Sequence, residues 1–231
     1  MQNGIRTTLA LLVMSCLQAV PGAAQNIESP YRFLTSRQAI NVYGGYLATG
    51  KGSLELGPQS GPLFGVRYGI AISGPFTLEG DIGYFSRMRA VFDTVPGDTS
   101  RQRAGETDFS VMTATASLRF NLTGPRTWHG IQPYVQLGAG IAVEVSGDSE
   151  IETDLPGDVR LDFGTGFTGI LGGGIDWFMA DRWGLRLDAR NLLWKLGTPR
   201  AFLIKGEQAR LLPADEWAQN FALTASLVFR F

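Results

Sequence analysis

The segment QNFALTASLVFRF, residues 219–231, decides the fold of this chain. Every second position is apolar, and the positions between are mostly small or polar. The apolar positions are Phe221, Leu223, Ala225, Leu227, Phe229 and Phe231. Such an alternation is typical of a β-strand whose two faces meet different environments. Because the termini of soluble proteins usually fray into water, an apolar face that continues to Phe231 predicts lipid beside the strand.

The composition of the chain limits its class. It has 231 residues, of which 44% are hydrophobic and 18% are charged, and its formal net charge is -1. These values suit a single domain and exclude a disordered chain and a strongly basic nucleic-acid-binding protein. The mean hydropathy of +0.03 is lower than that of a bundle of transmembrane helices. The 30 glycines favour turns and tightly curved strands.

The N-terminal segment, residues 1–24, has the order of a secretory signal peptide. Arg6 precedes the short apolar run 9–13, and small residues lead to a cleavage site expected after Ala24. A transmembrane anchor is the alternative. However, Ser15 and Gln18 interrupt the apolar run, which falls short of the roughly 20 apolar residues that a spanning helix needs. We therefore expect export through a cleaved signal.

Cys16 is the only cysteine of the chain and lies within this segment. The sequence around it, residues 13–16, loosely matches a lipoprotein cleavage box, so lipidation of Cys16 is the alternative to cleavage after Ala24. If cleavage follows Ala24, the mature chain has no cysteine. It then carries no disulfide, thiol nucleophile or thiolate metal site.

The remainder divides into a lead-in, residues 25–37, and a domain, residues 38–231, with eight alternating segments. The predicted strands are 38–49, 63–73, 76–92, 108–122, 131–145, 161–179, a strand from 183 to about 191, and 219–231. Long and short connections alternate between them, and 202–212 could hold a helical turn. Long connections at one end and tight turns at the other are typical of an all-β, eight-stranded antiparallel up-and-down transmembrane β-barrel. Closure of the sheet leaves no edge unpaired in hydrocarbon.

The two faces of the strands distinguish two kinds of barrel. In segment 63–73, one face carries Phe64, Val66 and Tyr68, and the other carries Gly65 and Arg67. A soluble eight-stranded barrel of the lipocalin kind would place the apolar face inside. Small residues and paired charges suit a crowded interior, so we expect the apolar face to contact lipid. The five tryptophans lie near predicted strand ends, which fits aromatic girdles, although core packing would also use tryptophan.

The signal, the eight alternating strands, the three tight turns and the terminal Phe231 together resemble the small outer-membrane β-barrel family. This family includes OmpX-type proteins and the OmpA-type transmembrane domain. The resemblance implies outer-membrane lipid and lipopolysaccharide as surroundings, and periplasmic chaperones and the barrel-assembly machinery as partners during biogenesis. It also implies that Phe231 is an assembly signal and that the barrel is a monomer. No peptidoglycan-binding domain is expected after the barrel.

Charged residues on the inward face are the candidate site. An isolated buried ion is very costly, so acids and arginines inside the barrel must pair. We expect a salt-bridge network that plugs the barrel, with a gated narrow ion path as the alternative. The predicted network is Arg67, Glu79, Asp81, Arg87, Arg89, Arg119, Glu144, Asp176, Arg186, Asp188, Arg190 and Arg230.

Catalytic chemistry has little support in the sequence. His129, the only histidine, falls in the short connection 123–130, away from the outer-leaflet substrates of barrel enzymes. Glu79 and Asp81 could do acid/base work but face the predicted plug. The acidic connection 146–160 matches no calcium-loop spacing. We therefore expect no enzyme, no cofactor and no metal.

The sequence thus predicts an integral outer-membrane protein with a structural or surface-interaction role. Its contact surfaces are expected in the long connections 51–60, 93–107, 146–160 and 197–216. A small-solute or ion channel is the alternative, and an envelope lipid-modifying enzyme is a weaker one.

Overall fold

The computed structural model describes residues 29–52, 57–94, 101–147, 153, 157, 163–197 and 215–231. Tyr31–Phe231 forms one compact unit, and the regular elements of its described residues are strands. Among the described residues, no helix is long and apolar enough to cross a membrane. The predicted signal with Cys16, the predicted helical turn at 202–212 and most of the acidic connection 146–160 lie outside the described residues.

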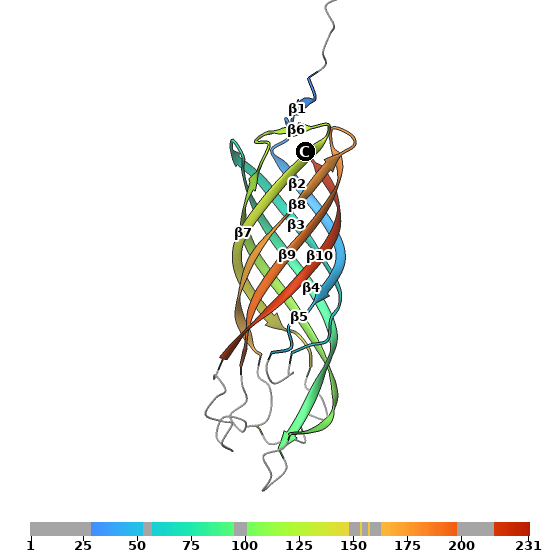
Figure 1. Cartoon of the computed structure of the whole chain (residues 1–231), viewed down its shortest axis with the longest axis vertical. Helices are drawn as coiled ribbons and strands as arrows, with labels where there is room; N and C mark the ends of the chain where they lie inside the picture. Colours follow the sequence, from blue (N-terminus) through green and yellow to red (C-terminus); the bar gives the residue numbers. More distant parts are fainter. Residues whose placement is uncertain are drawn as a thin grey trace, which may run out of the picture. The chain divides into compact units, whose positions relative to one another are not determined.

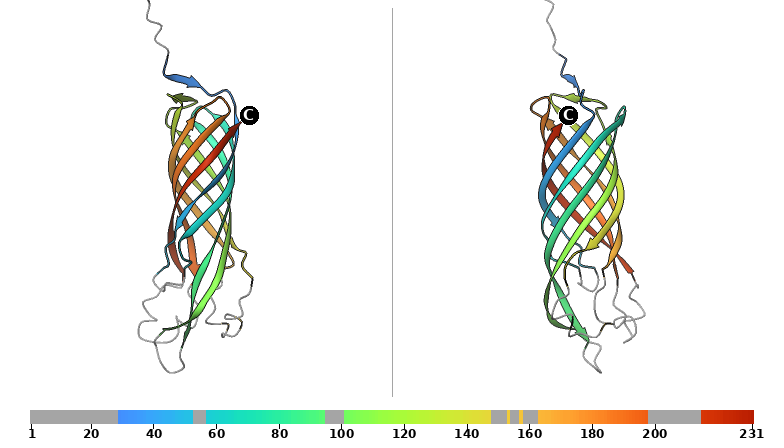
Figure 2. Two further views of the ribbon diagram at one scale, coloured as in Figure 1. Left: turned by 90° about the vertical axis from the view of Figure 1, so that its right-hand side faces the viewer. Right: turned by 180° about the vertical axis from the view of Figure 1, so that it is seen from behind.

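Eight long strands form a closed barrel (Figures 1 and 2). They are β2 (Gln38–Ala48), β3 (Gly61–Ser73), β4 (Phe76–Thr94), β5 (Arg101–Asn121), β7 (Ile131–Glu144), β8 (Thr165–Phe178), β9 (Trp183–Gly197) and β10 (Asp215–Arg230). Each pairs with the next along the chain in antiparallel register, and β10 pairs with β2 from Phe221↔Ala48 to Arg230↔Ala39. The prediction of an eight-stranded antiparallel up-and-down barrel is confirmed.

The barrel has an apolar outside and a polar inside. Leu137 and Leu223 are each 67% exposed and Leu187 is 63% exposed, whereas Arg67 and Thr224 are 1% and 2% exposed on the inward face. This arrangement is the reverse of a soluble barrel and is the one found in barrels surrounded by lipid. The predicted assignment of the two faces is therefore confirmed.

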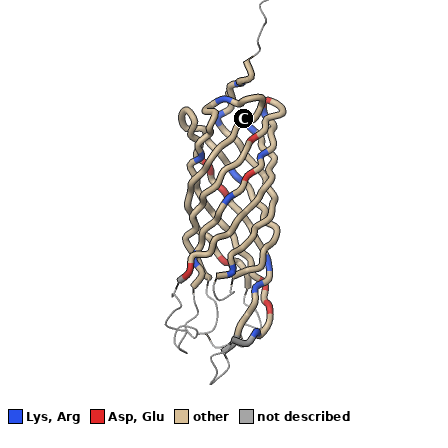
Figure 3. The backbone as a smooth tube through the Cα atoms, viewed as in Figure 1, with Lys and Arg blue, Asp and Glu red and all other residues tan. Residues whose placement is uncertain are grey.

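The two ends of the barrel differ. The connections at 74–75, 122–130 and 179–182 lie at one end together with Gln38 and Phe231, and we call this the turn end; the opposite end is the loop end (Figure 2). Phe231 closes the sheet at the turn end, where its backbone exchanges two hydrogen bonds with Gln38. Its ring is exposed and stacks on Phe229 with centroids 6.1 Å apart. Figure 3 shows Lys and Arg positions, in blue, among the connections at this end.

Two short strands at the turn end were not predicted. β1 (Tyr31–Phe33) pairs with β6 (Arg126–Trp128), so the lead-in is attached to the connection between β5 and β7. The Arg126 guanidinium lies 5.5 Å from the Tyr31 ring and 5.4 Å from the Phe33 ring. A three-residue strand carries too little alternation to be recognised from sequence.

The strands at the loop end also extend further than predicted. β4 and β5 continue as a paired hairpin to Thr94↔Arg101, although β3 pairs with β4 only as far as Leu63↔Phe85. Residues 101–107, predicted as part of a loop, therefore belong to a strand that projects beyond its neighbour β3. β9 and β10 likewise pair as far as Asp215↔Gly197.

Two aromatic residues are placed differently from the prediction. Phe163 falls within the predicted strand 161–179 and has the parity of the exposed Phe167, but it is buried because it precedes β8, so the alternation does not extend to it. Trp194, expected in a girdle, is 1% exposed and packs edge-on against Phe163 with centroids 6.1 Å apart. The other four tryptophans are exposed, as expected for girdles: Trp128, Trp177, Trp183 and Trp217.

A lysine on the lipid face tests the membrane assignment. Leu223 lies in the middle of β10, between Tyr46 and Ala189 of the neighbouring strands. Leu223→Lys is expected to lower the free energy of unfolding in lipid vesicles by about 2–4 kcal/mol, because a charge at the bilayer midplane is poorly solvated. Urea titration of the refolded variant measures this change.

The matched control is Leu122→Lys, which changes another exposed leucine, in the turn directly after β5. Its cost is expected to be at most about 1 kcal/mol, because a lysine near the interface reaches water. Equal costs for the two variants would contradict a membrane around the middle of the barrel.

Candidate functional site: the charged interior of the barrel

Inward positions of β3, β4 and β9 form a closed ring of alternating charges, which we call the central quartet: Arg67, Asp81, Asp188 and Arg190. Arg67 Nε lies 2.8 Å from Asp81 Oδ2, and Arg67 Nη1 lies 2.8 Å from Asp188 Oδ2. Arg190 completes the ring, with Nη1 3.1 Å from Asp81 Oδ2 and Nε 3.0 Å from Asp188 Oδ1. All four residues are buried.

A second ring, the turn-end quartet, consists of Glu79, Arg119, Asp176 and Arg186. Arg186 Nη1 lies 2.7 Å from Glu79 Oε2, and Arg186 Nε lies 2.6 Å from Asp176 Oδ1. Arg119 pairs with Asp176 and lies 3.9 Å from Glu79. These four residues are 2–3% exposed.

Both quartets contain two arginines and two carboxylates, so each is neutral as a unit. This balance matters because the burial of a lone ion in a low-dielectric interior costs roughly several kcal/mol of folding free energy. A hydrogen-bonded ion pair recovers most of that cost. The Thr224 hydroxyl donates a further bond to Asp188 at 2.8 Å. Asn121 accepts one from Arg119 Nε at 2.7 Å. The contacts of the central quartet, together with the bond from Thr224 to Asp188, link four strands of the barrel: β3, β4, β9 and β10.

Each quartet is backed by a tyrosine that the predicted network omitted. The Arg67 and Arg190 guanidinium carbons lie 4.1 and 5.0 Å from the centre of the Tyr43 ring, and the Tyr43 hydroxyl donates to Asp81 at 3.1 Å. Tyr134 faces Arg119 at 3.9 Å and Arg186 at 5.1 Å. Such cation–π contacts stabilise arginines whose charge is removed from water.

The space for Tyr43 comes from glycine. Gly65 lies opposite Tyr43 across the β2–β3 pair, and a Cβ at Gly65 would lie 2.4 Å from the Tyr43 hydroxyl. A Cβ at Gly83 would lie 2.8 Å from the same oxygen. The sequence contained this signal, because a large aromatic residue on the polar face of β2 stands opposite a glycine.

The remaining four predicted residues lie outside the quartets. Arg89 is buried with its guanidinium 5.7 Å from the Phe109 ring, and Arg230 is half-buried and donates to the Ser36 carbonyl. Glu144 is half-buried and accepts a hydrogen bond from Ser146 Oγ at 2.7 Å.

The prediction that Arg87 belongs to the interior charge network is corrected, because its side chain is exposed and lies against Gly61. It has the inward parity of Phe85. It lies beyond the last β3–β4 pair, Leu63↔Phe85, where parity alone does not decide burial, since Arg89 has the same parity and is buried.

The interior closes toward the loop end with a cluster of apolar side chains, which we call the loop-end plug: Leu47, Leu63, Phe85, Phe109, Val111, Phe163, Leu192 and Trp194. Only a cavity of about 10 Å³ separates its inner surface from Tyr43, Asp81 and Arg190. Such a volume holds at most about one water molecule.

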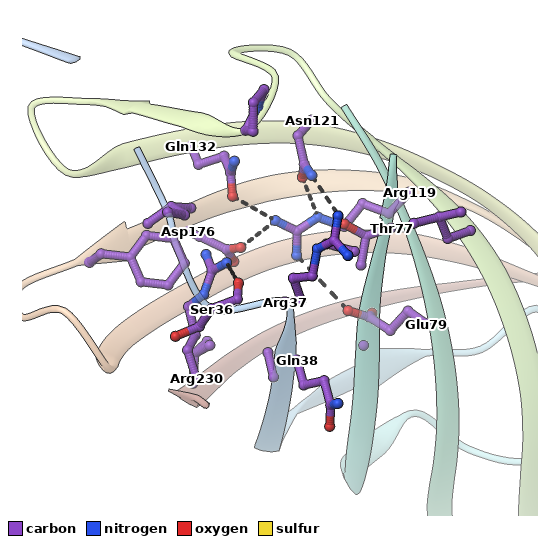
Figure 4. Close-up of a pocket in the computed structure, with 18 of the residues that line it drawn as sticks. Ser36, Arg37, Gln38, Thr77, Glu79, Arg119, Asn121, Gln132, Asp176 and Arg230 are labelled. Atoms are coloured by element: carbon purple, nitrogen blue, oxygen red, sulfur yellow. Dashed lines mark hydrogen bonds and ion pairs between the residues drawn. The ribbon is translucent and has the colours of Figure 1, made fainter. Parts of the chain in front are cut away.

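A larger pocket of about 250 Å³ lies on the other side of the quartets and opens at the turn end (Figure 4). All four members of the turn-end quartet line it, and residues 34–37 of the lead-in form one wall. Exposed Thr35 and Gly74 mark its opening. The pocket is therefore bounded inward by charge.

The histidine of the chain lies outside this charged interior. His129 is exposed in the turn after β6, with φ at 50°, and its ring meets Trp128 edge-on at 4.8 Å. Within the described ranges, no group of three or more His, Cys, Asp or Glu side chains is close enough to hold a metal ion.

Comparisons with known proteins agree with this architecture. A family model described as "outer membrane protein beta-barrel domain" matches residues 7–231. Neisserial surface protein A is similar in structure, with a TM-score of 0.51 and 14% identity over 84% of this chain and 97% of that one. OprG of Pseudomonas aeruginosa has a TM-score of 0.50 and 11% identity over 85% and 97%. At these identities the likeness concerns the fold alone. No curated protein sequence matches the chain.

Removal of one charge tests the central quartet. Asp188→Asn is expected to lower the free energy of unfolding by about 3–5 kcal/mol, because Arg67 and Arg190 are left to share Asp81 in a buried site. Urea unfolding in vesicles measures the loss. Glu144→Gln is the control with a half-buried carboxylate, and its expected cost is about 1 kcal/mol or less.

A double-mutant cycle then tests the coupling. Asp188→Asn combined with Arg190→Gln is expected to cost less than the sum of the two single changes, because the second change removes one of the two arginines that the first left sharing Asp81. Strictly additive costs would show that the quartet does not act as a unit.

Proposed function

Because the chain belongs to the outer membrane protein beta-barrel domain family, we propose that it is an integral outer-membrane protein whose filled barrel has a structural or surface-interaction role. One observation carries this proposal, namely the order of layers inside the barrel. Four successive inward positions on β4 pass through these layers. Glu79 belongs to the turn-end quartet and Asp81 belongs to the central quartet. Gly83 lies beside Tyr43, and Phe85 belongs to the loop-end plug.

These layers leave little room for a solute. An eight-stranded barrel is only just wide enough to be filled by its own side chains. Here two ionic rings and an apolar plug follow one another, and the cavity between the central quartet and the plug measures about 10 Å³. This packing supports a closed barrel over a porin-like small-solute or ion channel.

The orientation follows from the usual topology of such barrels, in which short turns face the periplasm and long loops face outward. The loop end is then the surface that meets the environment. A surface pocket of about 380 Å³ between Lys51, Gln59 and Arg103 at this end supports a contact role. Lipid and lipopolysaccharide surround the apolar face, and the barrel is a monomer.

Biogenesis completes the proposal. Residues 1–24 are a cleaved export signal, residues 25–37 are a lead-in, and residues 38–231 are the barrel domain. Periplasmic chaperones and the barrel-assembly machinery receive the chain, and Phe231 is part of the signal that the machinery recognises. The chain is not an enzyme, and it needs no cofactor and no nucleic acid for this role.

Electrical recording in planar bilayers tests the closed barrel. We expect the purified, heat-modifiable protein to show no discrete conductance steps at any applied voltage, because both quartets would have to separate before ions passed. Discrete conductance steps would contradict the closed barrel. If their size changes in the Arg119→Ala variant and stays unchanged in the Arg182→Gln variant, where the residue is exposed, they would establish the channel.

Trimming of the loops tests the surface role. Replacement of residues 146–160 and 198–214 by short turns is expected to leave the boiled-versus-unboiled gel shift intact, because the quartets and the plug hold the barrel. The same change is expected to abolish attachment of expressing cells to polystyrene and to cultured cells. Unchanged attachment to both surfaces would show that the loops are spacers.

A further inference from the structure

We propose that the turn-end pocket is a binding site for a small anion that carries a phosphate or carboxylate group, held by Arg230 and Arg37 (Figure 4). The inference is independent of any conduction through the barrel. It concerns the solution at the turn end, to which the pocket opens beside exposed Thr35, Arg37 and Gly74.

The charges that line the pocket are unbalanced. Four arginines and two carboxylates line it: Arg37, Arg119, Arg186, Arg230, Glu79 and Asp176. Both carboxylates already pair with Arg119 and Arg186 in the turn-end quartet. Within the described part of the chain, no carboxylate forms an ion pair with Arg37 or Arg230. Two positive charges therefore remain for a ligand.

Arg230 has hydrogen-bonding capacity that the protein does not use. Its Nη2 donates to the Ser36 carbonyl, and its guanidinium lies 5.0 Å from the Phe178 ring. Its Nε is buried and has no partner among the described residues. A buried donor without an acceptor is unfavourable. The planar fork of a guanidinium matches the oxygens of a carboxylate or phosphate.

The wall that carries Arg37 is fixed in place. The lead-in is tied down on both sides, because β1 pairs with β6 and the Leu34 amide donates to the Pro125 carbonyl at 3.1 Å. The Arg37 carbonyl accepts from the Ala71 amide at 2.7 Å. The backbone of Arg37 is thus held opposite Arg230 before any ligand arrives, which lowers the entropy cost of binding.

The size of the pocket limits the ligand. A volume of about 250 Å³ is many times the roughly 10–15 Å³ that a single water molecule requires on the same measure. It accepts inorganic phosphate, a small carboxylate or a phosphorylated headgroup. The buried, fully paired turn-end quartet forms the floor, so the anion meets arginines at the mouth and no free carboxylate below.

A titration with inorganic phosphate tests the site. The full-length barrel, labelled with nitrogen-15 and refolded in a non-ionic detergent free of phosphate, is titrated while the arginine Nε–Hε resonances are recorded by NMR. We expect saturable shifts for one site, with the largest change at Arg230. Arg230→Gln is expected to weaken the affinity at least tenfold, and Arg37→Gln is expected to weaken it to a smaller degree.

The matched control is Arg182→Gln. It removes the same charge at the same end, but Arg182 is exposed and does not line the pocket. Its affinity is expected to equal that of the unchanged protein. If Arg230→Gln loses the heat-dependent gel shift, its barrel has not folded. The Arg37→Gln variant, which changes an exposed side chain, then tests the binding site instead. Linear shifts without saturation, or equal weakening in Arg182→Gln, would overturn the proposal.

A second experiment distinguishes the two sources of the anionic group, a lipid headgroup and a free solute. Nanodiscs of phosphatidylcholine alone and of phosphatidylcholine with phosphatidylglycerol are compared without added phosphate. Shifts of the Arg230 resonance caused by phosphatidylglycerol identify a lipid headgroup as the ligand. Shifts that require added phosphate in both nanodiscs identify a free solute. The absence of shifts in nanodiscs and in detergent alike would overturn the site.

Discussion

The pairing of β10 with β2 is the constraint on which the rest of this structure depends. A sheet in hydrocarbon has no water to satisfy the N–H and C=O groups of an edge, so an open sheet would leave a row of them unpaired. The antiparallel register from Phe221↔Ala48 to Arg230↔Ala39 removes that edge. Once the sheet is closed, the alternation of each strand decides everything else, because one face must meet lipid and the other must fill a narrow interior.

Filling that interior with polar groups requires compensation at each level along the axis. The chain meets this requirement with two neutral rings rather than with isolated pairs, and each ring rests on a tyrosine face. Toward the loop end, the interior becomes apolar, because Phe109, Phe163 and Trp194 pack edge to face. The charged layers and the apolar plug thus close the barrel by different means, the first through paired charge and the second through packing.

Much of the fold could be predicted from the chain. Period-two alternation located all eight barrel strands and gave the correct facing of Arg67, Asp188 and Leu223. The errors lie where alternation is short or where a neighbouring strand ends. β1 and β6 have three residues each, Phe163 precedes β8, and Arg87 lies beyond the last β3–β4 pair. Beyond the last β3–β4 pair, parity alone does not decide burial, since Arg87 is exposed and Arg89, of the same parity, is buried.

The sequence by itself determined the number of strands, their two faces and the need for charges to pair, since these follow from local alternation and from the cost of burying an ion. Only the tertiary structure decided which charges meet. Glu79 and Arg186 are 107 residues apart in the chain, and Arg67 and Asp188 are 121 apart. The turn-end pocket is likewise a tertiary feature, because the lead-in and all eight barrel strands supply residues that line it. Strand register and barrel closure bring these side chains together, and neither can be predicted from the residue spacing within a single segment.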